Sequence, residues 1–388
     1  MDSLVGLLGM AVFLTLAYLA STNRKAIEWR TVVAGLGLQV ALGLFVLKTD
    51  AGAWVFTQLG DMVTALLAFT EAGTRMVFGP KIVDEKVLGI VFAFQVLPTV
   101  VFISSLFTLL YHLGALQALV RVMAWAMMRL MRVSGAESLS SAANVFMGHT
   151  EAPLIVKPYL VSMTRSELLC LMSAGMATIS GGVMAAYVGM GIDARALITA
   201  SVMAAPGVIV ISKLLLPETE EPLTRGIVRV KVEKTTVNSL DALAKGASEG
   251  MHLAINILAM LIAFLAMVAL LDGILALANP DLTMAKIFSH VFSPVAWLIG
   301  IPAAEIPDVA TLLGTKLVLN EFVAYSDLTT LQAGDSALGS RTEMITTFAL
   351  CGFANVGAVA IQIGGIGALA GGYLASLMSA ALASVLIG

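Results

Sequence analysis

Long apolar runs separated by short polar segments dominate this chain. A transmembrane helix needs about 20 consecutive, mostly apolar residues. Eight stretches come close to this length, at residues 4–20, 31–48, 89–112, 166–188, 195–216, 250–272, 342–363 and 367–387. The pattern predicts an all-α integral membrane protein with eight transmembrane helices.

Three further apolar regions are interrupted by charge or proline and do not fit a simple span. Residues 51–80 carry charged side chains among apolar ones, which is typical of a helix lying in the membrane interface. Residues 136–162 form two short apolar pieces around Glu151, and residues 287–330 are broken in the same way around Glu321. Each of these two regions predicts a re-entrant hairpin, whose irregular tip is tolerated only where it is buried or lines a cavity.

The order of these features occurs twice along the chain. Each unit has a long span, a broken region with an acid, a span interrupted by small and polar residues, and a final plain span. The interruptions are ATISGG (177–182) and GFANVGA (352–358). Because the first unit enters from outside and the second from inside, the repeats are inverted. Inverted repeats with discontinuous helices are typical of secondary transporters with a site near the membrane midplane.

The polar stretch 217–248 separates the two units. Lys and Arg concentrate on the side that also holds residues 22–30, so the positive-inside rule predicts an external N-terminus. We expect five parts: N-terminal spans, interfacial helix and first scaffold helix (1–112), first transport elements (113–216), a cytoplasmic loop (217–249), second scaffold helix and connector (250–286), and second transport elements (287–388).

Composition supports the membrane assignment. The 388 residues are 59% hydrophobic and 12% charged, whereas a soluble domain carries about 25% charged residues. The mean hydropathy is +0.95. Cys170 and Cys351 lie in apolar runs without the spacing of a disulfide framework or a metal site, so we expect buried thiols. Zinc, P-loop and dinucleotide motifs are absent from the sequence.

Glu151 and Glu321 are the most informative polar residues. A carboxylate at membrane depth costs at least about 2.5 kcal/mol, so each acid requires polar surroundings. We expect the two acids to face one aqueous cavity from opposite sides. The simpler alternatives are a surface pair between Glu151 and Lys157, a periplasmic loop position for Glu321, and a satisfied interior histidine at His149.

The helix interruptions also favour cation binding. Broken helices expose main-chain carbonyl oxygens, and Asn144 and Thr178 add side-chain oxygens near the first hairpin and the first broken helix. Such hard oxygen ligands suit Na⁺ and other hard cations. Ordinary helix packing is the alternative role for both side chains.

Six separated blocks of the sequence resemble signature stretches of the concentrative nucleoside transporter family. They are STNRKAIEWRTVVAGLGLQ (21–39), FAFQVLPTVVF (92–102), SGAESLSSAANVF (134–146), GHTEAPLIVKPYL (148–160), NEFVAY (320–325) and CGFANVGAVAIQIGG (351–365). The resemblance runs from about residue 20 to the end of the chain. It implies a homotrimer that imports nucleosides together with Na⁺ or, in some members, H⁺. A transport domain would move like an elevator against a scaffold.

Matching these motifs carries the family's substrate contacts onto this chain. His149 takes the place of a base-binding glutamine, beside Thr150 and Glu151, and Glu321 matches a glutamate that binds the ribose hydroxyls. Four more positions match the same pocket: Val183, Phe353, Asn355 and Ala358. Ala358 replaces a serine, and the join between GGIGALA and GGYLAS lacks the basic loop usual in the family.

The resemblance also implies a Na⁺ site. It places the ion on the side-chain oxygens of Asn144 and Thr178 and on main-chain carbonyls at Met147 and Ile179.

We therefore expect a Na⁺-driven nucleoside symporter, multi-pass in a bacterial inner membrane, with the lipid bilayer and further copies of itself as partners and no nucleic acid. Na⁺ would order the tip of the first hairpin. Two alternatives stay open: coupling to H⁺ through His149 and Glu151, and a nucleobase or modified nucleoside as cargo. An intramembrane hydrolase would need a metal triad or a serine nucleophile motif, and this sequence contains neither. A passive channel is a further alternative, and it would not concentrate its substrate.

Overall fold

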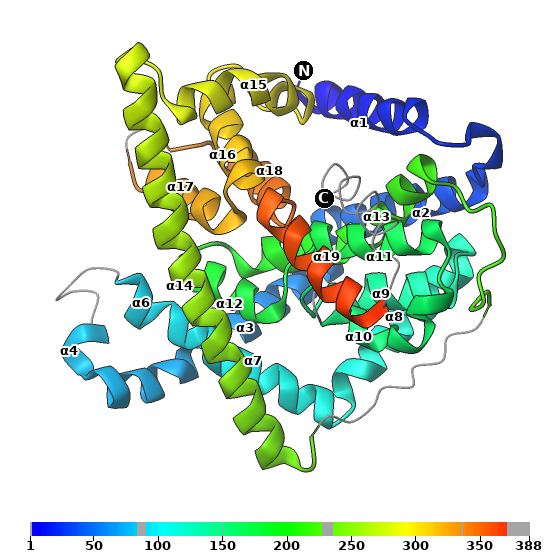
Figure 1. Cartoon of the computed structure of the whole chain (residues 1–388), viewed down its shortest axis with the longest axis horizontal. Coiled ribbons are helices and arrows are strands. Elements are labelled where there is room, and N and C mark those ends of the chain that lie inside the picture. The colour runs from blue at the N-terminus through cyan, green and yellow to red at the C-terminus, as the bar shows by residue number, and fades with distance from the viewer. Residues whose placement is uncertain (1, 84–90, 150, 227–235, 335–336, 371–388) are drawn as a thin grey trace.

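The computed structural model describes residues 2–83, 91–149, 151–226, 236–334 and 337–370, and these residues are almost entirely helical (Figure 1). Within those ranges, the β-type pairing is a single isolated antiparallel bridge between Ser134 and Arg225. The predicted all-α class is confirmed. The eighth predicted span, 367–387, and the join that precedes it fall largely outside the described residues.

The N-terminal part contains three long helices and two short ones: α1 (Asp2–Leu19), α2 (Trp29–Lys48), α3 (Asp50–Phe78), α4 (Pro80–Val83) and α6 (Phe92–Gln95). The first unit follows with α7 (Leu97–His112), α8 (Ala115–Met131), α9 (Gly135–Asn144), α10 (Ala152–Ile155), α11 (Arg165–Ala177), α12 (Gly181–Gly189) and α13 (Ala194–Leu215). The second unit contains α14 (Ser239–Ala278), α15 (Met284–Leu298), α16 (Ile306–Val318), α17 (Glu321–Gln332), α18 (Ser340–Leu350) and α19 (Val356–Ala370).

Several of these helices are long and apolar enough to cross a membrane. Within the described ranges, α2, α3, the pair α11 and α12, α13 and α14 meet this test by length and composition. The helices α7 and α8 also meet it together, although the chain bends by 74° between them. The helix α3 meets the test too, so its predicted place in the membrane interface remains a prediction.

Both predicted hairpins have the expected form of two helical pieces around a polar tip. The first runs from α9 through residues 145–151 to α10, and the second joins α16 to α17 with Glu321 as the first residue of α17. Both predicted interrupted spans are broken as well, between α11 and α12 and between α18 and α19. The same order of elements therefore occurs in both units.

Two helices were not predicted as separate elements. In each unit a helix, α8 or α15, lies between the long first helix and the hairpin. The buried residues of α8 recur at helical spacing, at Leu116, Val120, Ala124, Met127 and Met131, so one face of this helix packs against the protein. Residues 113–216 were expected to form the first hairpin, a broken helix and a span, with no separate helix at 115–131.

The second unit also begins earlier than predicted. The helix α14 has 40 residues and starts at Ser239, inside the stretch 217–249 that we expected to be a loop. Asn238 caps this start, because its side-chain oxygen accepts the Asp241 amide at 2.8 Å. Among the charged residues of that stretch, Asp241, Lys245 and Glu249 lie on the first turns of this long helix, which packs along α7 (Figure 1).

The two broken helices meet at their breaks. Gly352, in the second break, has a φ of +150°, which favours glycine. A Cβ atom there would lie 2.7 Å from the Met176 carbonyl oxygen, at the end of α11. The absence of a side chain therefore allows the two interruptions to cross in contact.

A buried charged cluster anchors the start of the first hairpin. Glu137 and Glu167 close capping boxes at the first turns of α9 and α11, and each side chain accepts the N-cap amide. Lys213, near the end of α13, forms an ion pair with Glu137 and donates to Ser166 at 2.7 Å. The cluster joins three helices at one end of the hairpin.

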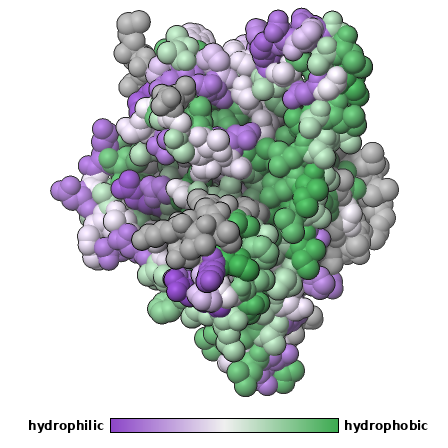
Figure 2. All heavy atoms as spheres, turned by 90° about the vertical axis from the view of Figure 1, so that its left-hand side faces the viewer, coloured by the Kyte–Doolittle hydropathy of each residue, from purple (hydrophilic) through white to green (hydrophobic). Residues whose placement is uncertain are grey.

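One flank of the molecule is strongly apolar. Figure 2 shows a hydrophobic band on this side, and α14 contributes exposed apolar side chains along much of its length. They include Met251, Ile255, Ile262, Leu265, Leu270 and Ile274. Large exposed apolar surfaces mark contact with a membrane or another protein.

Candidate functional site

Glu321 lies at the centre of the candidate site. Asn320 begins α17 with a capped turn, since its side-chain oxygen accepts the Val323 amide at 2.9 Å. Glu321 is only 3% exposed. Its carboxylate accepts hydrogen bonds from the Tyr187 hydroxyl at 3.0 Å and from the Asn355 side-chain amide at 2.9 Å. Burial and these bonds exclude the surface-loop alternative for Glu321.

The carboxylate therefore joins three elements that are far apart in the sequence: the second hairpin, α12 and the second helix break. Asn355 is itself fixed, because its side-chain oxygen accepts the main-chain amide of Ala358 at 2.8 Å. Val183, Phe353 and Ala358 belong to the same buried cluster as Tyr187. The structure thus brings together the predicted positions Val183, Glu321, Phe353, Asn355 and Ala358, and it places Ala358 in contact through its backbone.

His149 extends this group to the first hairpin. Its ring lies edge-on to Phe353, with ring centroids 4.8 Å apart and planes inclined by 67°. Both ring nitrogens are buried and have no hydrogen-bond partner among the residues that the structure describes. His149 is therefore not a satisfied interior histidine. The neighbouring predicted residue, Thr150, lies outside the described residues.

Glu151 occupies a more open position at the same tip. The residue is exposed, and its side chain accepts the Gly148 amide at 3.2 Å. Although both residues are described, no ion pair joins Glu151 to Lys157, so the predicted surface pair is not formed. One carboxylate, Glu151, is exposed at the first hairpin, while the other, Glu321, is buried at the second.

The candidate cation ligands lie at two adjacent chain breaks. The Gly181 amide, at the start of α12, donates to the Phe146 carbonyl in the first hairpin at 3.0 Å. This bond joins the segment containing Asn144 and Met147 to the break containing Thr178 and Ile179. Thr178 has extended backbone and is 1% exposed, and Ile179 is fully buried.

Asn144 provides the best evidence that this region fits a cation. Its side-chain nitrogen donates to the Ser140 carbonyl at 2.9 Å, which leaves the side-chain oxygen as an acceptor. That oxygen is buried and has no donor within the described part of the chain. A buried acceptor without a partner is costly unless something satisfies it. A hard cation would do so, and the donors here are oxygens of the kind that Na⁺ prefers.

Sequence reasoning missed Tyr187. This side chain is fully buried, donates to Glu321 and stacks near Phe322 and Tyr325, with ring centroids 4.7 and 4.5 Å away. Its position was available from spacing, because Tyr187 follows Val183 by four residues and so lies on the same helix face.

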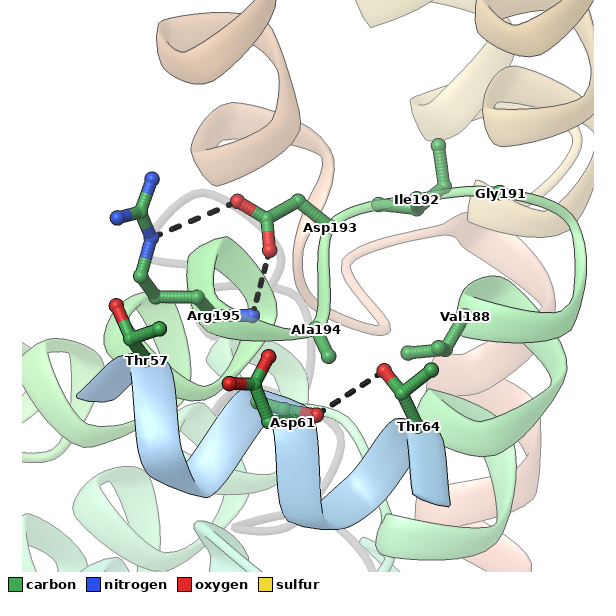
Figure 3. A pocket seen from close by; sticks show the side chains of 10 residues that line it. Thr57, Asp61, Thr64, Val188, Gly191, Ile192, Asp193, Ala194 and Arg195 are labelled. Atoms are coloured by element: carbon green, nitrogen blue, oxygen red, sulfur yellow. Dashed lines mark hydrogen bonds and ion pairs between the residues drawn. The ribbon is translucent and has the colours of Figure 1, made fainter. Parts of the chain in front are cut away.

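A separate hollow lies away from these residues, between α3 and the connection from α12 to α13 (Figure 3). Its volume is about 370 Å³, and its polar lining includes Thr57, Asp61, Thr64, Asp193 and Arg195. The Arg195 amide donates to Asp193 at 2.8 Å, which fixes the start of α13. None of the predicted site residues lines this hollow.

Three family models match consecutive parts of the chain. Residues 8–81 match the N-terminus and residues 196–388 the C-terminus of a Na⁺ dependent nucleoside transporter. Residues 93–194, which include the first hairpin and first broken helix, match a model described as nucleoside recognition.

Known proteins resemble the chain over nearly its full length. An uncharacterized transporter of Haemophilus influenzae is 43% identical over 100% of this chain and 99% of its own length. Sodium/nucleoside cotransporter 1 of Mus musculus is 43% identical over 94% of this chain, which spans 58% of the length of that relative. A solved structure of CNTnw in an inward-facing substrate-bound state is 40% identical, with a TM-score of 0.95 over 100% of this chain and 94% of that one. The resemblance noted in the sequence is thereby confirmed, and the chain belongs to the Na⁺-dependent nucleoside transporter family.

Proposed function

We propose that this protein imports nucleosides across a bacterial inner membrane, driven by the Na⁺ gradient. The observation that carries the proposal is the buried Glu321 carboxylate, held by Tyr187 and Asn355. The names of relatives, which include sodium/nucleoside cotransporters, support the same cargo and coupling ion.

The chemistry of Glu321 suits a ribose ring. An ionised carboxylate offers about four lone-pair sites, and the protein occupies two of them. The remaining acceptor sites match two neighbouring hydroxyl donors, and hydrogen bonds to a charged acceptor are about twice as strong as neutral ones. His149, Thr150, Glu151, Val183 and Phe353 would then surround the base.

Na⁺ coupling would act through the first hairpin. Asn144 and Met147 belong to the hairpin, whereas Thr178 and Ile179 belong to the adjacent break. An ion held by both would fix the hairpin tip and so prepare the base-binding side of the pocket. Thermodynamic linkage then requires nucleoside to raise the affinity for Na⁺ by the same factor.

The protein would form a homotrimer, as the family resemblance implies. Each copy would contain two inverted repeats and a transport domain that moves like an elevator. The two units share one order of elements, and the exposed apolar flank of α14 supplies surface for lipid or for neighbouring copies. Both hairpins and both broken helices would move together, because their contacts meet at Glu321 and Gly352.

The cargo is tested by competition against uptake of labelled uridine and adenosine. Nucleosides should compete, whereas ribose-free bases should compete at least about tenfold more weakly because they cannot reach the acceptors of Glu321. Glu321→Ala should abolish this ribose-dependent difference. Equal competition by base and nucleoside would reject the nucleoside assignment in favour of a nucleobase cargo.

The coupling ion is tested by equilibrium binding of nucleoside to purified protein at several Na⁺ concentrations and at several pH values. The apparent nucleoside affinity should rise with Na⁺, and Asn144→Ala should shift this rise to higher Na⁺ concentrations. Affinity that ignores Na⁺ and follows pH would instead support H⁺ coupling through His149 and Glu151.

A further inference from the structure

Lys316 is a buried lysine in the second hairpin. It is the third residue from the end of α16 and is 6% exposed. Its ammonium donates to the Ala349 main-chain carbonyl at 2.9 Å. Lysines within a membrane are costly, so those that occur pair with acids or main-chain carbonyls and mark functional sites. Neither the proposed ribose contact nor the proposed Na⁺ site uses this residue.

The Ala349 carbonyl belongs to the last turn of α18, directly before the second helix break. The last four carbonyls of a helix lack partners within the helix. A cation is favourable there because this end of a helix carries partial negative charge. The same break carries Asn355, whose side chain donates to Glu321 at 2.9 Å. Lys316 therefore ties together the hairpin and the break that hold the Glu321 carboxylate.

Lys316 also supplies positive charge near Glu321, which follows it by five residues. The ammonium and the carboxylate attract each other. Other titratable side chains around this carboxylate are Tyr187, Tyr325 and Cys351, and phenol and thiol groups are neutral near pH 7. A buried carboxylate without a compensating charge takes up a proton. The lysine thus favours the charged form of the acid.

The corresponding place in the first unit has no such lysine. There Asn144 ends α9, the first arm of the hairpin, and its buried side-chain oxygen has no donor within the described part of the chain. In the second unit α16 is the matching arm, and its lysine reaches the end of α18, the helix that corresponds to α11. The first junction of hairpin and break therefore needs a cation from solution, whereas the second has a cation of its own.

We propose that the Lys316 ammonium is a built-in cation that fixes the ribose half of the pocket without Na⁺, as Na⁺ fixes the base half. Lys316 is a positioning residue, which acts through Glu321 and the second break. This inference rests on the proposed nucleoside transport and Na⁺ coupling. It divides the pocket into one half that depends on the ion and one that does not.

Ribose recognition is measured as a ratio of inhibition constants against labelled nucleoside. Uridine is paired with 2′,3′-dideoxyuridine, and adenosine with 2′,3′-dideoxyadenosine, since each analogue lacks both ribose hydroxyls. The pair whose parent nucleoside binds more tightly is used. A ratio on one protein does not depend on how much of that protein is active.

Wild-type protein should favour the parent nucleoside by about tenfold or more, because the analogue leaves a buried acceptor unpaired. This ratio should stay within about twofold between saturating and limiting Na⁺, although both ligands bind more weakly at limiting Na⁺. The comparison needs no substitution. A ratio that collapses at limiting Na⁺ would overturn the proposal.

Two substitutions should then separate the halves. Lys316→Met removes the charge and should lower the ratio about fivefold or more, because hydrogen bonds to a charged acceptor are about twice as strong as neutral ones. Lys316→Arg keeps the charge and should retain more of the ratio. Asn144→Ala is the matched control: at saturating Na⁺ its ratio should stay within about twofold of the wild type, whereas its half-saturating Na⁺ concentration rises.

The Na⁺ dependence gives the reverse pattern. At nucleoside concentrations well below Kd, Lys316→Met should leave the half-saturating Na⁺ concentration within about twofold of the wild type. An equal loss of affinity for both members of the pair in Lys316→Met, or a rise in half-saturating Na⁺ as large as that of Asn144→Ala, would overturn the proposal. A wild-type ratio near one, or wild-type binding that ignores Na⁺, would instead reject the proposed function.

Discussion

The buried ion pair between Lys213 and Glu137 leads to a quantitative stability prediction. The two side chains are 8% and 1% exposed, and the Lys213 ammonium also donates to Ser166 and Glu218 at 2.7 and 3.4 Å. Replacing Lys213 by methionine keeps much of the side-chain volume but leaves the Glu137 charge buried beside Glu167. Removing one partner of a buried pair costs about 3–5 kcal/mol.

The expected result is a lower thermal unfolding midpoint in detergent, by about 5–10 °C on the scale of large domains. Lys213→Met combined with Glu137→Gln should recover most of the loss, because both charges are removed while an acceptor remains for the Ser134 amide, which now donates to Glu137 at 3.0 Å.

Lys245→Met provides the matched control for this measurement. Lys245 pairs with Glu249 at 4.0 Å, but the side chains are 39% and 58% exposed. Surface pairs contribute about 0–1 kcal/mol, so this variant should unfold close to the wild-type temperature. Equal midpoints for Lys213→Met and Lys245→Met would refute the reasoning that burial makes the first pair important.

Substitutions at three further positions test the site and its surroundings. Glu321→Gln should raise the KM for nucleoside uptake about 10–100-fold, because a charged acceptor becomes neutral; an unchanged KM would contradict a ribose contact. Gly352→Ala should lower the unfolding midpoint by an amount equivalent to about 1–3 kcal/mol, given the positive φ and the Met176 carbonyl 2.7 Å from the new Cβ. Gly364→Ala meets nothing within 4 Å and should be nearly neutral. Asn144→Ala should raise the half-saturating Na⁺ concentration at least about tenfold, while Asn144→Asp retains an oxygen and should lose less.

The interruptions in the chain were the best-predicted features. Small and polar residues inside apolar runs located both helix breaks, and the structure ends α11 at Ala177 and resumes with α12 at Gly181, within the predicted ATISGG. Glu151 and Glu321 identified the two hairpins for a related reason. A carboxylate within an apolar region requires polar surroundings, and a re-entrant tip supplies them.

Amphipathic and long polar-ended helices were harder to recognise. The search for apolar spans did not identify α8, although its buried face follows helical spacing from Leu116 to Met131. The start of α14 at Ser239 was also missed, because charged residues occur in loops and on solvated helix turns alike.

Contacts between distant segments could not be predicted from the sequence. Met176 and Gly352 are separated by a whole repeat, and their meeting depends on how two broken helices cross. Periodicity identifies the face of a helix but not its partner. For this reason the hydrogen bond from Tyr187 to Glu321 and the group around His149 emerged only from the structure.

The most direct test of the account is concentrative uptake of uridine and adenosine into proteoliposomes, with the Na⁺ and pH gradients varied independently. An inward Na⁺ gradient alone should accumulate nucleoside above its external concentration, and a Na⁺ ionophore should collapse that accumulation. Accumulation that persists without Na⁺ and follows an inward H⁺ gradient would contradict Na⁺ coupling. Equilibration without accumulation under either gradient would contradict symport itself.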